Sequence, residues 1–98
     1  MSGRRLMDVK NFSIGIGLND QEVPVCLIIS YDSLEKGGDI AIRADKARAL
    51  GGDLYLTAGN EVLVLKDIEP QCEELILKGL PIVVIDPQRE REILIETI

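Results

Sequence analysis

The sequence predicts a small α+β or α/β domain built on a single mixed β-sheet of five to six strands with two helices. Two observations carry this prediction. Hydrophobic residues make up 46% of the chain and are mostly Ile, Leu and Val, which suits strands packed against short helices. A strand, a helix and a strand also follow one another over about 62–85, which indicates one βαβ unit with parallel strands.

The length of 98 residues predicts one domain, 1–98, with 1–10 as a candidate flexible N-terminal segment. No apolar stretch approaches the roughly 20 residues that span a bilayer, and the N-terminus lacks the apolar centre of a secretory signal. We therefore expect a soluble, cytoplasmic protein. Abundant Glu, Arg and Ile beside few Gln and Asn also fit a thermophilic source.

Two hairpins are expected. Residues 11–18 alternate large apolar with small residues, and residues 23–31 form a near-continuous apolar run typical of a buried strand. A polar turn separates them, so they are predicted to pair. The second hairpin joins strands at 54–58 and 61–66 around Gly59-Asn60, a pair that tolerates the positive φ of a tight turn.

The stretch before Gly51-Gly52 leaves two interpretations open. Apolar residues recur at helical spacing from Ile40 to Leu50, and Asp39 is a candidate N-cap, which favours a helix over this stretch. The alternation of the two isoleucines instead favours a short strand at 39–43, with a helix from about residue 45.

The helix of the expected βαβ unit has clear boundaries. Glu69 precedes a proline and is therefore pushed out of helical geometry, while Pro70 suits the first helical position. Gly79 ends the helix, and a buried strand at 81–85 follows. The β-branched tail at 92–98 is predicted to be a final edge strand, with a short helix as the alternative.

Three apolar strands end in aspartate, and the βαβ unit brings two of these residues together. Asp67 and Asp86 follow strands expected to be parallel, so both would lie at one edge of the sheet and offer oxygen ligands to Mg²⁺. Asp32 would lie at the other edge. The alternative is that each aspartate caps the next turn or helix. Asp67 and Asp86 are thus candidate metal ligands, and no other cofactor is predicted.

Gly37 and Gly38 form a second candidate site, for a small ligand. Two glycines between a strand and a helix resemble a turn whose free N–H groups cradle phosphate. The P-loop spacing is absent, and Glu35 and Asp39 flank the glycines and would repel an anion. The alternative interpretation is a flexible turn.

The composition removes most catalytic constellations. The chain has no histidine, no tryptophan and three other aromatic residues, so general acid–base catalysis and aromatic binding platforms lack their usual side chains. Cys26 and Cys72 have no CxxC partner and are expected to be reduced core thiols. A net charge of −6 disfavours nucleic-acid binding.

The leading functional hypothesis is a non-enzymatic protein-interaction or regulatory module that acts as a small homo-oligomer. Its expected partners are further copies of itself and an unknown protein, with no nucleic acid and no membrane. The alternative is a small-ligand or metal-binding domain, such as a subunit of a multi-chain enzyme, that uses the candidate sites above.

Overall fold

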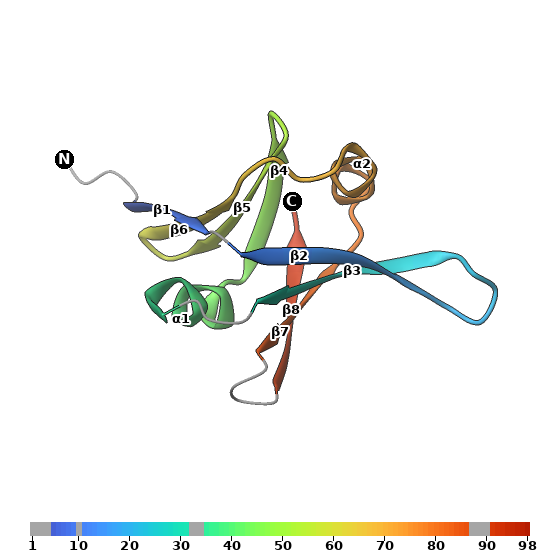
Figure 1. Cartoon of the computed structure of the whole chain (residues 1–98), viewed down its shortest axis with the longest axis horizontal. Helices are drawn as coiled ribbons and strands as arrows, with labels where there is room; N and C mark the ends of the chain where they lie inside the picture. Colours follow the sequence, from blue (N-terminus) through green and yellow to red (C-terminus); the bar gives the residue numbers. More distant parts are fainter. Residues whose placement is uncertain (1–4, 10, 32–34, 87–90) are drawn as a thin grey trace.

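The computed structural model describes residues 5–9, 11–31, 35–86 and 91–98, which form one eight-stranded mixed sheet with two short helices (Figure 1). In chain order the elements are β1 (Arg5–Val9), β2 (Phe12–Leu18), β3 (Pro24–Tyr31), α1 (Glu35–Arg43), β4 (Lys46–Leu50), β5 (Asp53–Ala58), β6 (Glu61–Leu65), α2 (Pro70–Leu77), β7 (Ile82–Asp86) and β8 (Arg91–Thr97).

The α+β class is confirmed, but the prediction of five to six strands is wrong. The two additional strands are β1 and β4. β1 lies in the segment that the sequence marked as a candidate flexible N-terminus; residues 1–4 and 10 of that segment lie outside the described residues. β1 is short and carries two charged residues, so its pairing with β6 depends on a partner far away in the sequence.

The strand order is β1-β6-β5-β4-β8-β7-β3-β2, and it divides the sheet in two. We call β1, β6, β5 and β4 the first half-sheet, and β8, β7, β3 and β2 the second half-sheet. They meet at the parallel β4–β8 ladder, which has only two residue pairs, Lys46↔Glu96 and Ala47↔Thr97. The sheet is therefore continuous but narrow at this junction.

The expected βαβ unit at about 62–85 is wrong, although its strands and helix all exist. β6 and β7 are not neighbours: β6 pairs in parallel with β1, and β7 pairs in parallel with β3. Each helix instead carries the chain from one half-sheet to the other, α1 from β3 to β4 and α2 from β6 to β7. The rule for right-handed crossovers applies only to parallel strands of the same sheet that are joined by the crossover. Which strands become neighbours depends on segments that are distant in the sequence.

Both predicted hairpins are confirmed. β2 and β3 are antiparallel from the pair Phe12↔Tyr31 to the pair Gly17↔Cys26, with an irregularity just beyond Gly17. β5 and β6 are antiparallel around Gly59, which has the positive φ of 61° that its turn requires. The hairpin strands were predictable because turn residues and period-two alternation are local signals.

The helix expected from Asp39 to Leu50 is wrong, and so is the alternative strand at 39–43. The helix is α1, which starts before Asp39 and ends at Arg43. Lys46–Leu50 is strand β4, in which buried Ala47 and Ala49 alternate with exposed residues. Alanine, lysine and arginine favour helices intrinsically, but burial of one face of a strand outweighs that preference.

The second helix follows the prediction. α2 begins at Pro70 after extended Glu69 and ends before Gly79, which has a φ of 91°. Cys72 and Ile76 form its buried side. The following strand, β7, is also confirmed. The tail is a strand as predicted, but β8 is not at an edge, because it lies between β4 and β7.

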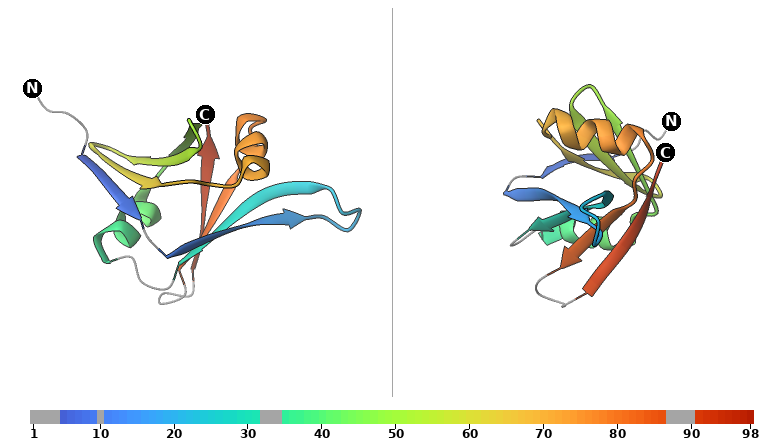
Figure 2. Two further views of the ribbon diagram at one scale, coloured as in Figure 1. Left: turned by 45° about the horizontal axis from the view of Figure 1, so that its top comes forward. Right: turned by 90° about the vertical axis from the view of Figure 1, so that its right-hand side faces the viewer.

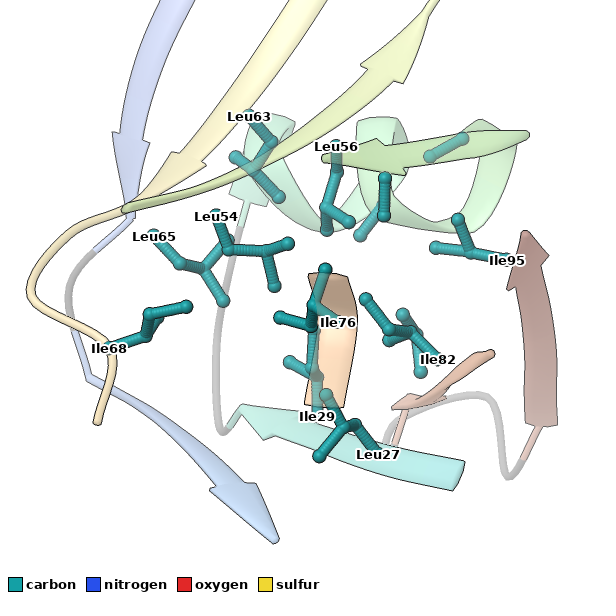
Figure 3. Close-up of a cluster of buried hydrophobic side chains, with 14 of the residues drawn as sticks. Leu27, Ile29, Leu54, Leu56, Leu63, Leu65, Ile68, Ile76, Ile82 and Ile95 are labelled. Atoms are coloured by element: carbon teal, nitrogen blue, oxygen red, sulfur yellow. The ribbon is translucent and has the colours of Figure 1, made fainter. Parts of the chain in front are cut away.

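The hydrophobic core fills the space that the curled sheet encloses. Figure 3 shows Leu and Ile side chains from both half-sheets and from α2 pointing toward one another. Leu54 and Leu56 come from the first half-sheet, Ile82 and Ile95 from the second, and Ile76 from α2; all five are fully buried. Because each half-sheet contributes, neither has a core of its own.

The β2–β3 hairpin extends beyond the rest of the molecule as an arm (Figures 1 and 2). It contributes to an elongated shape with principal extents of 47 × 30 × 20 Å. The tip of the arm is held by Asn19, whose Oδ1 accepts hydrogen bonds from the backbone N–H groups of Gln21 (2.8 Å) and Val23 (3.1 Å). The tip is therefore a defined turn.

Candidate functional site

The two faces of the sheet differ in what covers them. Residues paired across neighbouring strands point to the same face, and the row Met7, Leu63, Leu56 and Ala47 points toward the core. Both helices pack on this face, since their buried residues belong to the same core cluster. Within the described residues, no helix covers the opposite face, which we call the outer face.

The outer face of the first half-sheet carries an apolar hollow. The cross-strand row Leu6, Val62 and Thr57 lies on this face. Leu6, Leu50 and Ile98 are 63%, 56% and 68% exposed, whereas Val62 is buried. The hollow has a volume of about 290 Å³. We call its lining the outer patch: Leu6, Arg48, Leu50, Tyr55, Thr57, Val62 and Ile98.

Sequence reasoning missed the outer patch because two of its strands were assigned otherwise. Leu6 fell in the candidate flexible segment, and Leu50 fell in the expected helix. The strict alternation of exposed and buried residues at 46–50 is the signal that would have found β4. That the patch gathers at all depends on β1 pairing with β6, which no local pattern encodes.

The structure removes the reason for pairing Asp67 with Asp86. Across the ladders, β6 runs in the same direction as β4 and β8, and β7 runs opposite to β8. Asp67 follows β6 and Asp86 ends β7. Because these two strands run in opposite directions, their C-terminal ends lie at opposite sides of the sheet. The backbone N–H of Asp67 donates to Asp53 Oδ1 at 3.0 Å. Magnesium binding stays a prediction without this support, and Asp32 lies outside the described residues.

Gly37 and Gly38 do not form the expected turn. Both lie within α1, and Gly38 is buried. The phosphate-cradling hypothesis required glycines in a loop, with N–H groups free of the helix. Ligand binding at these two glycines therefore stays a prediction, without the loop geometry that motivated it.

A second hollow lies between the start of β2 and the start of α2. Its volume is about 340 Å³, and we call it the α2 hollow. Asp67 and Glu69 are exposed at it, whereas Ile68 and Cys72 are buried. The lining consists of Phe12, Ser13, Ile14, Asp67, Ile68, Glu69 and Cys72.

Cys72 is not an activated thiol. Burial raises its pKa, and the nearby Glu69 carboxylate raises it further. A nucleophilic cysteine needs the opposite environment, one that favours the thiolate. Cys72 and Cys26 are both free thiols, as expected, but only Cys72 belongs to the core; Cys26 is half-buried and lies outside the core cluster.

A third hollow, of about 210 Å³, lies beside the end of α1. Its lining mixes both signs of charge: Arg5, Arg43, Asp39 and Glu61, with Met7. Arg43 Nη2 lies 3.4 Å from Glu61 Oε2, so this guanidinium is already paired. The mixed charge gives neither a cation nor an anion a strong reason to bind.

Metal-ligating side chains do not gather in the described ranges. Across 5–9, 11–31, 35–86 and 91–98, no three residues among His, Cys, Asp and Glu are arranged so that they could hold an ion. In the same part of the chain, neither helix is long and apolar enough to cross a membrane.

Comparison with known proteins gives no relative. The sequence matches no family model, and no curated protein and no solved structure is significantly similar to it.

Proposed function

We propose that this protein is a non-enzymatic protein-interaction or regulatory module that acts as a small homo-oligomer in the cytoplasm. The observation that carries the proposal is the outer patch, an apolar hollow on a sheet face that no described helix covers. Single exposed aliphatic residues are ordinary, but a group of them around one hollow is typical of a surface that meets another protein.

The composition of the outer patch suits a protein partner. Tyr55 and Arg48 are directly paired across β4 and β5, and both residue types are enriched in protein interfaces. Around them stand the three exposed aliphatic side chains of Leu6, Leu50 and Ile98. An apolar surface of another protein would displace water from most of this lining. A small polar ligand would find few hydrogen-bonding groups in it.

The chemistry of the chain supports a role without catalysis. The sequence has no histidine, and the buried thiol of Cys72 has a raised pKa. The acidic net charge of −6 gives no general attraction for nucleic acid. The partners proposed are therefore other copies of the chain and a further protein, with no cofactor.

Native mass spectrometry of the purified protein tests this function first. We expect a defined multimer at the mass of the bare chain. A stoichiometric adduct of a metal ion or small molecule would favour the alternative, a ligand-binding or metal-binding domain. A monomer at micromolar concentration would contradict the proposal.

The outer patch itself is tested with a dye that binds exposed apolar surface, 8-anilinonaphthalene sulfonate. We expect Leu50→Lys to reduce dye fluorescence by at least half. The matched control is Leu77→Lys on α2, because Leu77 is 66% exposed but lies outside the patch. Equal effects of the two variants would show that the patch is no special surface.

A further inference from the structure

The two edges of the sheet are protected to different degrees. β1 forms one edge and carries exposed charges on Arg5 and Asp8. β2 forms the other edge, and none of its residues is charged or proline. Charged edge residues discourage further strands from adding to a sheet, and an uncharged edge of this length invites them.

The lack of charge extends to both strands of the arm, whereas its tip carries Asp20 and Glu22. β2 and β3 together contain no Asp, Glu, Lys or Arg, although 29% of the chain is charged. Along these two strands, a strand from a strongly charged partner would gain no ion pair. Two copies that each carry a net charge of −6 repel one another least where they meet at such a surface.

The backbone of β2 has hydrogen-bonding groups that face away from the molecule. The N–H of Leu27 on β3 donates to the carbonyl of Pro81 at 2.9 Å, so Leu27 turns its polar groups toward β7 and away from β2. Its cross-strand partner, Ile16, must then turn its own N–H and C=O outward. By the two-residue period, Ile14 does the same.

An apolar projection and a hollow lie at opposite ends of this edge. Leu18, at the far end of β2, is 54% exposed. Phe12, at the near end, lines the α2 hollow together with Ile14 and Ile68. A strand that runs antiparallel to β2 would bring its own far end to this hollow.

We propose that β2 pairs antiparallel with β2 of a second copy, around a two-fold axis that passes by Gly15. Ile14 of each copy then exchanges N–H···O=C bonds with Ile16 of the other. Gly15 meets Gly15 across the axis, where no side chain obstructs the approach. Leu18 of the second copy lies opposite Phe12, at the mouth of the α2 hollow. The same set of hydrogen bonds therefore forms on both sides of the two-fold axis, as an isologous interface requires.

This inference rests on the proposed homo-oligomer and names its interface. The outer patch lies on the other half-sheet, so it stays open to a different partner in the dimer. The same edge could in principle accept a strand from an unrelated protein, and the test below separates that outcome.

The first test is native mass spectrometry and gel filtration of the wild type, Gly15→Lys and Leu50→Lys. A Cβ added at Gly15 meets nothing within 4 Å, so the lysine is accommodated in the free chain. Across the axis it places two like charges side by side. We expect the dimer dissociation constant to rise at least tenfold for Gly15→Lys and to change less than twofold for Leu50→Lys.

The outcomes separate the two proposals. A wild-type dimer that persists in Gly15→Lys overturns the β2 interface and leaves the oligomeric module standing. A monomeric wild type overturns both. An unrelated protein could instead be bound to the wild type and absent from Gly15→Lys. That outcome would overturn the claim that a second copy of this chain occupies the edge.

The second test is a cross-link in the Cys26→Ser background. Directly opposed residues in an antiparallel pair lie within the Cα separation that a disulfide spans. Gly15→Cys is therefore expected to form a covalent dimer under mild oxidation for most of the protein. Asp8→Cys, on the opposite edge, is the matched control and stays monomeric on a non-reducing gel. Equal cross-linking at both positions would overturn the proposed register.

Discussion

Side chains alternate between the two faces in both half-sheets, but the two half-sheets differ in how much of their apolar surface is buried. In the first half-sheet, Leu54, Leu56, Leu63 and Leu65 are all buried, and the edge strand carries charge. The second half-sheet ends in the arm, where the strands leave the body and residues such as Leu18 are largely exposed. The comparison teaches that alternation sets which face a residue occupies, whereas the covering elements decide whether that face is core or surface.

Matched leucine truncations give the largest expected contrast. Leu56→Ala in β5 is expected to lower the free energy of unfolding by about 2–5 kcal/mol, because Leu56 is fully buried and a cavity remains. Leu18→Ala in the arm is expected to cost about 1 kcal/mol or less, because half of its side chain is already in water. Urea unfolding measures both losses in the free energy of unfolding. A low protein concentration keeps the contribution of self-association small. Equal losses would remove the distinction between body and arm.

A glycine pair within the arm sharpens the comparison. A Cβ added at Gly17 would lie 2.5 Å from Cys26 Sγ, so Gly17→Ala is expected to lower the free energy of unfolding by about 1–3 kcal/mol. Gly15→Ala meets nothing and is expected to raise that free energy by about 0.5 kcal/mol. Thermal unfolding measures both. Adding Cys26→Ala to Gly17→Ala is expected to restore most of the loss; a persistent loss would mean that the glycine is required for another reason.

The tip of the arm is held by the Asn19 side chain together with two backbone hydrogen bonds, from Asn19 N–H to the Val23 carbonyl and from Glu22 N–H to the Asn19 carbonyl. Asn19→Ala removes the acceptor of two backbone N–H groups, and because both become hydrated, we expect a loss of about 1 kcal/mol. Hydrogen exchange at the amides of Gln21 and Val23 is expected to accelerate. Asn60→Ala is the control at the β5–β6 turn, because among the described residues no hydrogen bond involves the Asn60 side chain. Unchanged exchange at the arm tip would contradict the role of Asn19.

The smallest effect concerns the junction of the half-sheets. Lys46 Nζ donates to Glu96 Oε2 at 2.8 Å. This hydrogen bond and the attraction between the charges raise the pKa of Lys46 above 10.5 and lower the pKa of Glu96 below 4.5. The pair's stabilisation is thus present between pH 4.5 and 10.5. It is lost as the pH falls through the lowered pKa of Glu96 and as the pH rises through the raised pKa of Lys46. Both groups are exposed, so the effect on stability is small.

An NMR titration of the Glu96 carboxyl checks this directly. Lys46→Gln is expected to return the pKa of Glu96 toward 4.5. Lys78→Gln, which removes the partner of Glu74 on α2, is the control and leaves Glu96 unchanged. An unaltered Glu96 pKa in Lys46→Gln would show that the pair is not formed in solution.

Local signals in the sequence were sufficient for half of the fold. Pro70 and Gly79 bound α2, and Gly59 turns the β5–β6 hairpin, because caps and positive φ values are properties of single positions. β4 was mistaken for helix because its alanines and basic residues favour helix, and only burial of Ala47 and Ala49 makes it a strand.

The arrangement of the strands, and with it the candidate site, was not predictable from local signals. The parallel partners of β6 and β7 are β1 and β3, far away in the sequence. The outer patch combines β1, β4, β5 and β6 with the residue after β8, so it exists only once those pairings form. The Asp67 and Asp86 hypothesis failed to gain support for the same reason, because it assumed that β6 and β7 were neighbours.

The path of the chain between the half-sheets has a consequence for folding kinetics. The chain passes from the first half-sheet to the second after β1, returns through α1, and passes over again through α2. Each half is therefore assembled from two separate segments, and loops must close before either ladder is complete. We expect slow folding for a chain of this size, with one cooperative transition and no half that survives alone.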